Sequence, residues 1–118
     1  MSVLIVDDSS FIRSTIQRVV VGMGLEVCGL ASNGEEALEM IEQLEPKILT
    51  LDMVLPDMTG LDVLKVVKKH YPHMKVIMIT SMAKPSMIEE ARELNVDKYL
   101  TKPITEEDLG NAIGELKA

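Results

Sequence analysis

Short apolar segments alternate with segments of helical periodicity along the whole chain, and this alternation constrains the fold more than any other feature. The apolar runs that suit strands cover residues 3–6, 25–30, 48–51, 76–79 and 96–100. Apolar residues recur three or four positions apart, as on one face of an α-helix, over residues 12–23, 37–44, 61–67, 85–94 and 105–116. A strand is therefore expected before each of five helices.

This order predicts an α/β fold with a single parallel sheet. Neighbouring parallel strands need a right-handed crossover, usually a helix, so helices cover both faces of the sheet. Residues 3–6, 48–51 and 76–79 are uniformly apolar, as in central strands, whereas residues 25–30 and 96–100 carry charges and suit the edges. We expect a doubly wound, five-stranded parallel sheet in the order 2-1-3-4-5, with five helices.

The size and charge of the chain exclude several classes of function. Its 118 residues fit one domain, which we expect to span residues 1–118. The formal net charge of −7 repels phosphate backbones and anionic lipids, so we expect no binding to nucleic acid or to a membrane. We expect no leader, because the segment before Asp7 has neither a basic region nor a long apolar run, and we expect the single cysteine, Cys28, to be a buried apolar residue. These features predict a cytoplasmic protein.

Polar side chains stand where four of the expected strands end. Asp7 and Asp8 follow the first strand, Asp52 ends the third, Thr80 ends the fourth and Lys102 follows the fifth. Each residue alone is more typical of a helix cap, a strand end or a solvated surface. Parallel strands, however, bring their carboxyl ends to one edge of the sheet, where ligands of open α/β folds bind. We therefore expect these five side chains to form one site.

Three carboxylates in one site repel one another unless a cation joins them. A ligand set made only of oxygen atoms, with room for water, suits Mg²⁺ better than Zn²⁺. A metal-bound carboxylate beside a hydroxyl and an ammonium group is suited to receive a phosphoryl group, because all three can neutralise the transferring oxygens. The residues thus predict magnesium-dependent phosphoryl transfer with Asp52 as the nucleophile.

The same residues, in their local sequences, resemble the receiver domain of bacterial response regulators. The resemblance rests on the pair Asp7-Asp8, on LDMVLPDMTG around Asp52, on MITSM at the fourth strand and on YLTKP at the fifth. It covers essentially the whole chain and implies a flavodoxin-like fold. The strand order 2-1-3-4-5 is itself a described property of this family.

The resemblance implies a role for each matching position at the predicted metal site. Asp52 is implied as the phosphoacceptor, and Lys102 as the lysine that contacts the phosphate. The direct Mg²⁺ ligands are implied to be Asp8, Asp52 and the backbone carbonyl of Val54, and Asp7 is implied to act mainly through water. The peptide before Pro103 is implied to be cis.

The resemblance also implies how the phosphorylated state is read and how long it lasts. Thr80 and Tyr99 match a switch pair, in which the hydroxyl turns towards the phosphoryl group and the ring moves inward. Val54 and Met82 stand two residues after the phosphoacceptor and the switch threonine, where the family tunes hydrolysis. Both are apolar, so we expect slow dephosphorylation. Thr59 stands where many members carry aspartate.

We therefore expect a single-domain response regulator that accepts phosphate from a histidine kinase and signals by protein contact, not an enzyme with a separate substrate. The binding surface is implied to comprise the helix at 85–94, the strand at 96–100 and the helix at 105–116. The run VDDSSFIR resembles most the chemotaxis group, whose targets are a flagellar motor or an adaptor. The alternatives are a phosphorelay intermediate that passes phosphate to a histidine phosphotransferase, and a small phosphatase-like enzyme with an aspartate nucleophile.

Overall fold

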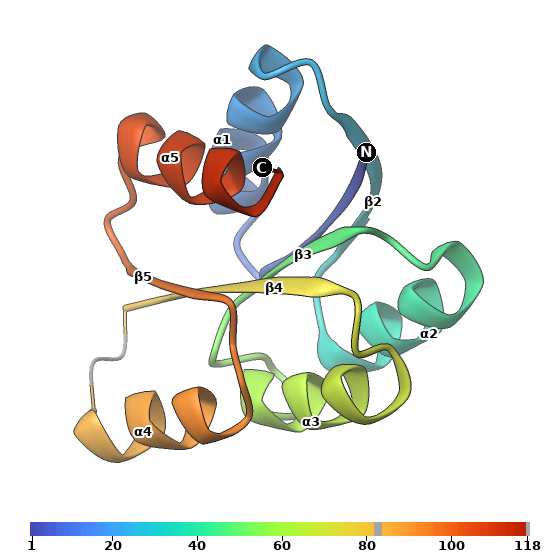
Figure 1. The fold of residues 1–118 in the computed structure, drawn as a ribbon, viewed down its shortest axis with the longest axis vertical. Coiled ribbons are helices and arrows are strands. Elements are labelled where there is room, and N and C mark those ends of the chain that lie inside the picture. The colour runs from blue at the N-terminus through green and yellow to red at the C-terminus, as the bar shows by residue number, and fades with distance from the viewer. Residues whose placement is uncertain (82–83, 118) are drawn as a thin grey trace.

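Strands and helices alternate strictly along the chain in the computed structural model, which describes residues 1–81 and 84–117 (Figure 1). Each expected segment is present, and its bounds differ by only a few residues. The elements are β1 (Ser2–Val6), α1 (Ser10–Gly22), β2 (Glu26–Ala31), α2 (Gly34–Leu44), β3 (Ile48–Leu51), α3 (Gly60–His70), β4 (Lys75–Thr80), α4 (Pro85–Glu93), β5 (Lys98–Thr101) and α5 (Glu106–Lys117).

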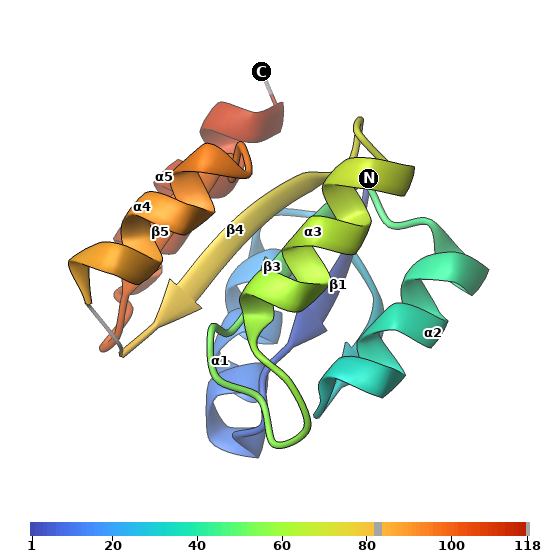
Figure 2. The ribbon, with the colours of Figure 1, turned by 90° about the horizontal axis from the view of Figure 1, so that it is seen from below.

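The five strands form one parallel sheet in the order β2-β1-β3-β4-β5, which confirms the predicted topology. Helices α1 and α5 cover one face of the sheet, while α2, α3 and α4 cover the other (Figures 1 and 2). The three central strands are buried on both faces, as their uniformly apolar sequences predicted.

Strand β1 shows how one apolar run supplies two cores. Successive side chains of a strand point to opposite faces of the sheet. Val3 and Ile5 accordingly pack with α1 and α5, whereas Leu4 and Val6 pack with α2 and α3. Because both faces are covered by helices, all four side chains are buried.

Cys28 differs from the sequence expectation, since its side chain is only partly buried. It lies on the edge strand β2, between Val27, which pairs with Val3, and Gly29, which pairs with Leu4. Cys28 is thus the extra residue of a β-bulge. Its Sγ donates a weak hydrogen bond to the carbonyl of Val3 at 3.4 Å.

Side chains cap the helices that begin nearest the carboxyl ends of β1, β2 and β3. Ser9 accepts a hydrogen bond from the third residue of α1, and Asn33 accepts one from the third residue of α2. Thr59 forms a reciprocal capping box with Asp62 at the start of α3. Within the described ranges, no helix is long and apolar enough to cross a membrane.

Candidate functional site

Three carboxylates meet at the carboxyl ends of two neighbouring strands. Asp7 and Asp8 follow β1 and Asp52 follows β3, and each offers an oxygen within 4.8 Å of those of the other two. The backbone explains this proximity, because Asp52 continues the ladder between β1 and β3 and its N–H donates to the carbonyl of Val6 at 3.1 Å. Asp7 and Asp52 are only 1% and 5% exposed, whereas Asp8 is open to solvent.

Lys102, just after β5, supplies a positive charge to this cluster. Its Nζ lies 2.8 Å from Asp7 Oδ2 and 3.1 Å from Asp52 Oδ2. Burial by itself lowers the pKa of the Lys102 ammonium group, but the hydrogen bonds and charges of the two carboxylates outweigh burial and raise that pKa. Lys102 therefore stays charged between the two aspartates.

The cluster remains short of positive charge. Burial raises the pKa of Asp52, and the nearby charge of Asp7 raises it further. Lys102 and the N–H of Val54, which is 3.4 Å from Asp52 Oδ1, lower that pKa only in part. One ammonium group thus faces three carboxylates in a partly dry site, a charge balance that favours binding of another cation.

The chemistry of the donor atoms fits a hard divalent cation. All three side chains offer carboxylate oxygens, the ligands that Mg²⁺ prefers, and the exposure of Asp8 leaves access for metal-bound water. Asp7 Oδ2 is buried, and its partner among residues 1–81 and 84–117 is the Lys102 ammonium group, 2.8 Å away. A carboxylate oxygen has more than one lone pair, so Oδ2 can also serve a metal or its water.

Two contacts that the sequence did not predict hold the turn after β1. The N–H of Ser9 donates to Asp7 Oδ1 at 2.9 Å. The Arg13 guanidinium donates to the backbone carbonyl of Asp7 at 2.6 Å, from the first turns of α1. These bonds fix both the carboxylate of Asp7 and the peptide that leads to Asp8. An arginine on a helix face gives no sequence signal for such a bond, because the acceptor is a backbone atom.

The other predicted site residues lie on β4, on β5 and in the loop after β3, with one exception. Thr80 is buried at the end of β4, and its carbonyl accepts the N–H of Lys102 at 2.9 Å. Tyr99 lies on β5, packed against the core beneath α2, α3 and α4, and its burial raises the pKa of the phenol. Val54 follows Asp52 and is 48% exposed. Met82 lies outside the described residues. The peptide between Lys102 and Pro103 is cis, as expected.

The loop between β3 and α3, residues 52–59, has contacts that the sequence did not reveal. Asp57, at the tip of this loop, accepts the N–H groups of Gly34 and Glu35 at 2.8 and 2.9 Å, which lowers the pKa of the Asp57 carboxyl. At its other end, Gly60 allows a close approach, since an added Cβ would lie 2.2 Å from the carbonyl oxygen of Asp52. The tip of the loop is thus tied to α2, and the residue that follows the loop, Gly60, packs against the backbone of Asp52.

The chain matches known proteins over nearly its whole length. The family model described as the response regulator receiver domain matches residues 3–114. The chemotaxis protein CheY of Thermotoga maritima is 38% identical over 101 residues, which cover 86% of this chain and 84% of that protein. The protein-glutamate methylesterase/protein-glutamine glutaminase of Pyrococcus horikoshii is 44% identical over 106 residues, which cover 87% of this chain but 28% of that protein.

Among solved structures, a CheY-like response regulator receiver domain protein from Methanospirillum hungatei superimposes with a TM-score of 0.93. That protein is 32% identical in sequence, and the match covers 98% of this chain and 93% of the other. Similarity thus extends over sequence and fold together.

Proposed function

Because the chain belongs to the response regulator receiver domain family, we propose that it accepts a phosphoryl group from a histidine kinase on Asp52, in a Mg²⁺-dependent reaction. The observation that carries this proposal is the cluster of Asp7, Asp52 and Lys102, together with the solvent-exposed Asp8 beside it. Asp8, Asp52 and the carbonyl of Val54 would hold Mg²⁺ directly, and Asp7 would hold it through water. Bound Mg²⁺ supplies positive charge for the oxygens of the transferring group.

The transfer itself is a displacement at phosphorus. A carboxylate oxygen of Asp52 forms the new P–O bond while the P–N bond of the donor's phosphohistidine breaks. The donor's imidazole leaves with the bonding electron pair, and Asp52 becomes an acyl phosphate. The Lys102 ammonium group already lies 3.1 Å from Asp52 Oδ2, where it can neutralise a phosphoryl oxygen. Thr80, buried at the end of β4, would supply a hydroxyl to the same group.

The signal then passes to another protein through the surface formed by α4, β5 and α5. Tyr99 links this surface to the site, because it stands on β5 opposite Met78, two residues before the end of β4. The similarity to a chemotaxis protein favours a role in chemotaxis, with a flagellar motor or an adaptor as the target. A phosphorelay intermediate has the same site and differs only in its partner.

Phosphorylation of purified protein tests the proposed acceptor. We expect the wild type to gain one phosphoryl group from acetyl phosphate or a labelled kinase when Mg²⁺ is present, as measured by intact mass. Asp52→Asn should gain none, while Asp108→Asn, at an exposed position on α5, should behave as the wild type. Undiminished labelling of Asp52→Asn, or labelling in excess chelator, would contradict the proposal.

Transfer experiments distinguish the two signalling roles. The chain is incubated in turn with each phosphorylated histidine kinase of its source organism, and then with the histidine phosphotransferases. Rapid labelling by a chemotaxis kinase, with no onward transfer, supports the chemotaxis role. Rapid onward transfer to a phosphotransferase histidine supports the relay role instead.

A further inference from the structure

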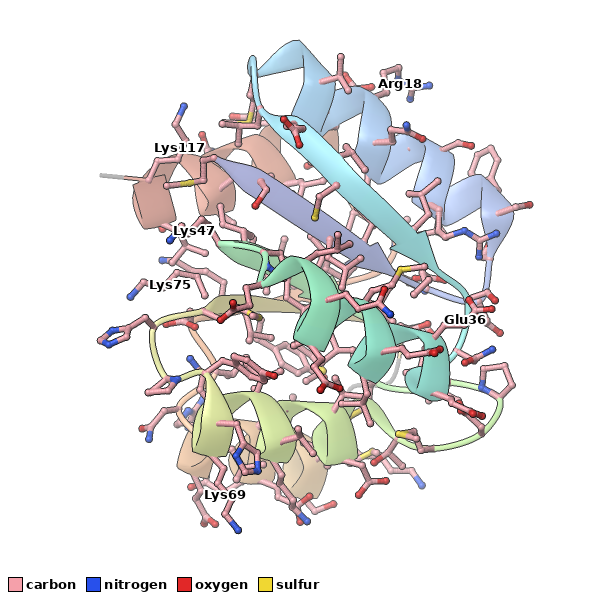
Figure 3. All side chains as sticks on the ribbon, turned by 90° about the vertical axis from the view of Figure 1, so that its right-hand side faces the viewer. Arg18, Glu36, Lys47, Lys69, Lys75 and Lys117 are labelled. Carbon is pink, nitrogen blue, oxygen red and sulfur yellow. The ribbon has the colours of Figure 1, made fainter. Side chains whose placement is uncertain are left out.

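The loop between β3 and α3 carries the Val54 carbonyl. Its tip is tied to α2, a helix that comes before β3 in the chain. We propose that Asp57 is a positioning residue for the metal site: by holding this loop against the first turn of α2, it fixes the Val54 carbonyl beside Asp52. This inference rests on the proposed Mg²⁺ site. Figure 2 shows the loop running beside the N-terminal end of α2, and Figure 3 labels Glu36 at this end of the helix.

Asp57 makes this connection with both oxygens of its carboxylate. Oδ1 accepts the N–H of Gly34 at 2.8 Å, and Oδ2 accepts the N–H of Glu35 at 2.9 Å. These donors belong to the first two residues of α2, whose N–H groups have no partner within the helix. A charged acceptor at the positive end of a helix makes stronger hydrogen bonds than a neutral one.

The neighbouring residue, Met58, presses on the same point of α2. A Cβ added to Gly34 would lie only 2.3 Å from Met58 Cγ and 2.5 Å from its sulfur atom. The Met58 side chain therefore lies directly on the Gly34 backbone, a contact that a larger residue would prevent. Two successive residues of the loop thus dock onto one residue of the helix.

Helix α2 has a cap of its own without this connection. Asn33 Oδ1 accepts the N–H of Glu36 at 2.8 Å, and Asn33 immediately precedes the helix, as an N-cap residue does. Asp57, by contrast, lies five residues after Asp52 in a segment outside the helices and strands, so the tip of the loop needs an anchor. We infer that the Asp57 carboxylate serves the loop as well as the helix.

Bonds within the loop can carry this restraint from its tip to Val54. The N–H of Leu55 donates to the carbonyl of Met58 at 3.2 Å, and Val54 and Thr59 form an antiparallel bridge. Residues 54–59 thus form a closed turn with Asp57 at its tip. A displacement of the tip would move the turn as a unit, and Val54 with it.

Two variants of Asp57 and one of Asn33 test the inference by Mg²⁺ titration calorimetry. Asp57→Ala should raise the Kd for Mg²⁺ on the order of three- to tenfold. This increase is no larger than the smallest loss of metal affinity that is usual when a residue supporting a metal ligand is removed. Asp57→Asn keeps one acceptor oxygen and should show a smaller increase. Asn33→Ala removes the helix's own cap and should lower the melting temperature without changing the Kd.

Hydrogen exchange of the metal-free protein gives a second readout. The Leu55 amide should exchange faster in Asp57→Ala than in the wild type or in Asn33→Ala. An unchanged Kd in Asp57→Ala, or an equal increase in Asn33→Ala, would overturn this inference alone. A wild type that binds no Mg²⁺ would overturn the proposed function as well.

Discussion

At the scale of single residues, Lys102 supplies the counter-charge to the buried carboxylates of the site. Its ammonium group contacts Asp7 and Asp52, which are both buried, while its own side chain is 17% exposed. Like charges held this close destabilise a fold unless a counter-charge lies between them. In the metal-free protein, Lys102 thus stabilises an arrangement of carboxylates that is poised for a second cation.

Replacing Lys102 with methionine should destabilise the metal-free protein by about 2–4 kcal/mol, because it leaves two buried carboxylates without their counter-charge. Urea denaturation in excess chelator measures the change in the free energy of unfolding. Lys98→Met is the matched control: Lys98 pairs with the exposed Glu115, and loss of such a surface pair should cost less than about 1 kcal/mol. Equal losses in the two variants would show that the buried position of Lys102 does not matter.

The lifetime of the acyl phosphate should depend on Val54 and Met82. Neither side chain can hydrogen-bond an attacking water, so the nucleophile is poorly positioned and hydrolysis should be slow. Val54→Asn combined with Met82→Glu should accelerate phosphoryl loss by about tenfold, equivalent to about 1.4 kcal/mol in the barrier. Phos-tag gels follow the decay after the donor is removed.

A control for this double variant is Val21→Asn, at an exposed position near the end of α1. It should leave the decay rate unchanged. Unchanged or slower decay in the Val54/Met82 variant, with folding and Mg²⁺ affinity intact, would show that these two side chains do not shield the phosphoryl group.

At the scale of elements, the start of α3 is packed against the end of β3. Gly60 opens the helix, and its N–H donates to the carbonyl of Met53 at 2.6 Å. An added Cβ would meet backbone atoms, at 2.2 Å from the Asp52 oxygen and 2.9 Å from Met53 Cα. Backbone atoms cannot move aside as a flexible side chain can, so the helix reaches this position only with glycine there.

Gly60→Ala should therefore lower the free energy of unfolding by about 2–3 kcal/mol, the upper part of the range for overpacking, and should also weaken phosphorylation of Asp52. Gly114→Ala is the opposite case, because nothing lies within 4 Å of the added Cβ in the interior of α5. That variant should gain about 0.5–1 kcal/mol from the helix propensity of alanine. Thermal or urea unfolding of both variants checks the two signs, and stabilisation by Gly60→Ala would contradict the close packing.

For the whole molecule, the sheet topology separates the carboxylate cluster from two of the lysines, Lys47 and Lys75. The carboxylate cluster lies at the carboxyl ends of the strands, whereas Lys47 and Lys75 lie at the opposite ends of β3 and β4 (Figure 3). The chain carries a net charge of −7, so acidic groups dominate its long-range field. Binding of a divalent cation would relieve repulsion at the point where buried negative charge is concentrated.

Mg²⁺ should therefore stabilise the folded chain as a whole. A ligand at ten times its Kd adds about 1.4 kcal/mol to the free energy of unfolding, which is several degrees in melting temperature for a domain of this size. Thermal melts with and without millimolar Mg²⁺ measure the shift. No shift in the wild type, or an equal shift in Asp8→Ala, would count against a metal site at these carboxylates.

The sequence by itself determined the order, type and approximate bounds of the elements, and the strand order of the sheet. These properties depend on local patterns: uniform apolar runs for β1, β3 and β4, helical periodicity between them, and charged residues in the edge strands. The topology then places the residues after β1, β3 and β5 together, so Asp7, Asp52 and Lys102 could be grouped without coordinates.

Only the tertiary structure decided which groups hold that cluster in place. Arg13 binds the carbonyl of Asp7, and Asp57 binds the N–H groups of Gly34 and Glu35. Each of these bonds joins a side chain to backbone atoms of another segment. Backbone N–H and carbonyl groups are common to nearly all residues, so their partners leave no pattern in a sequence. The partial exposure of Cys28 has a similar origin, since a bulge depends on the register between two strands and not on either strand alone.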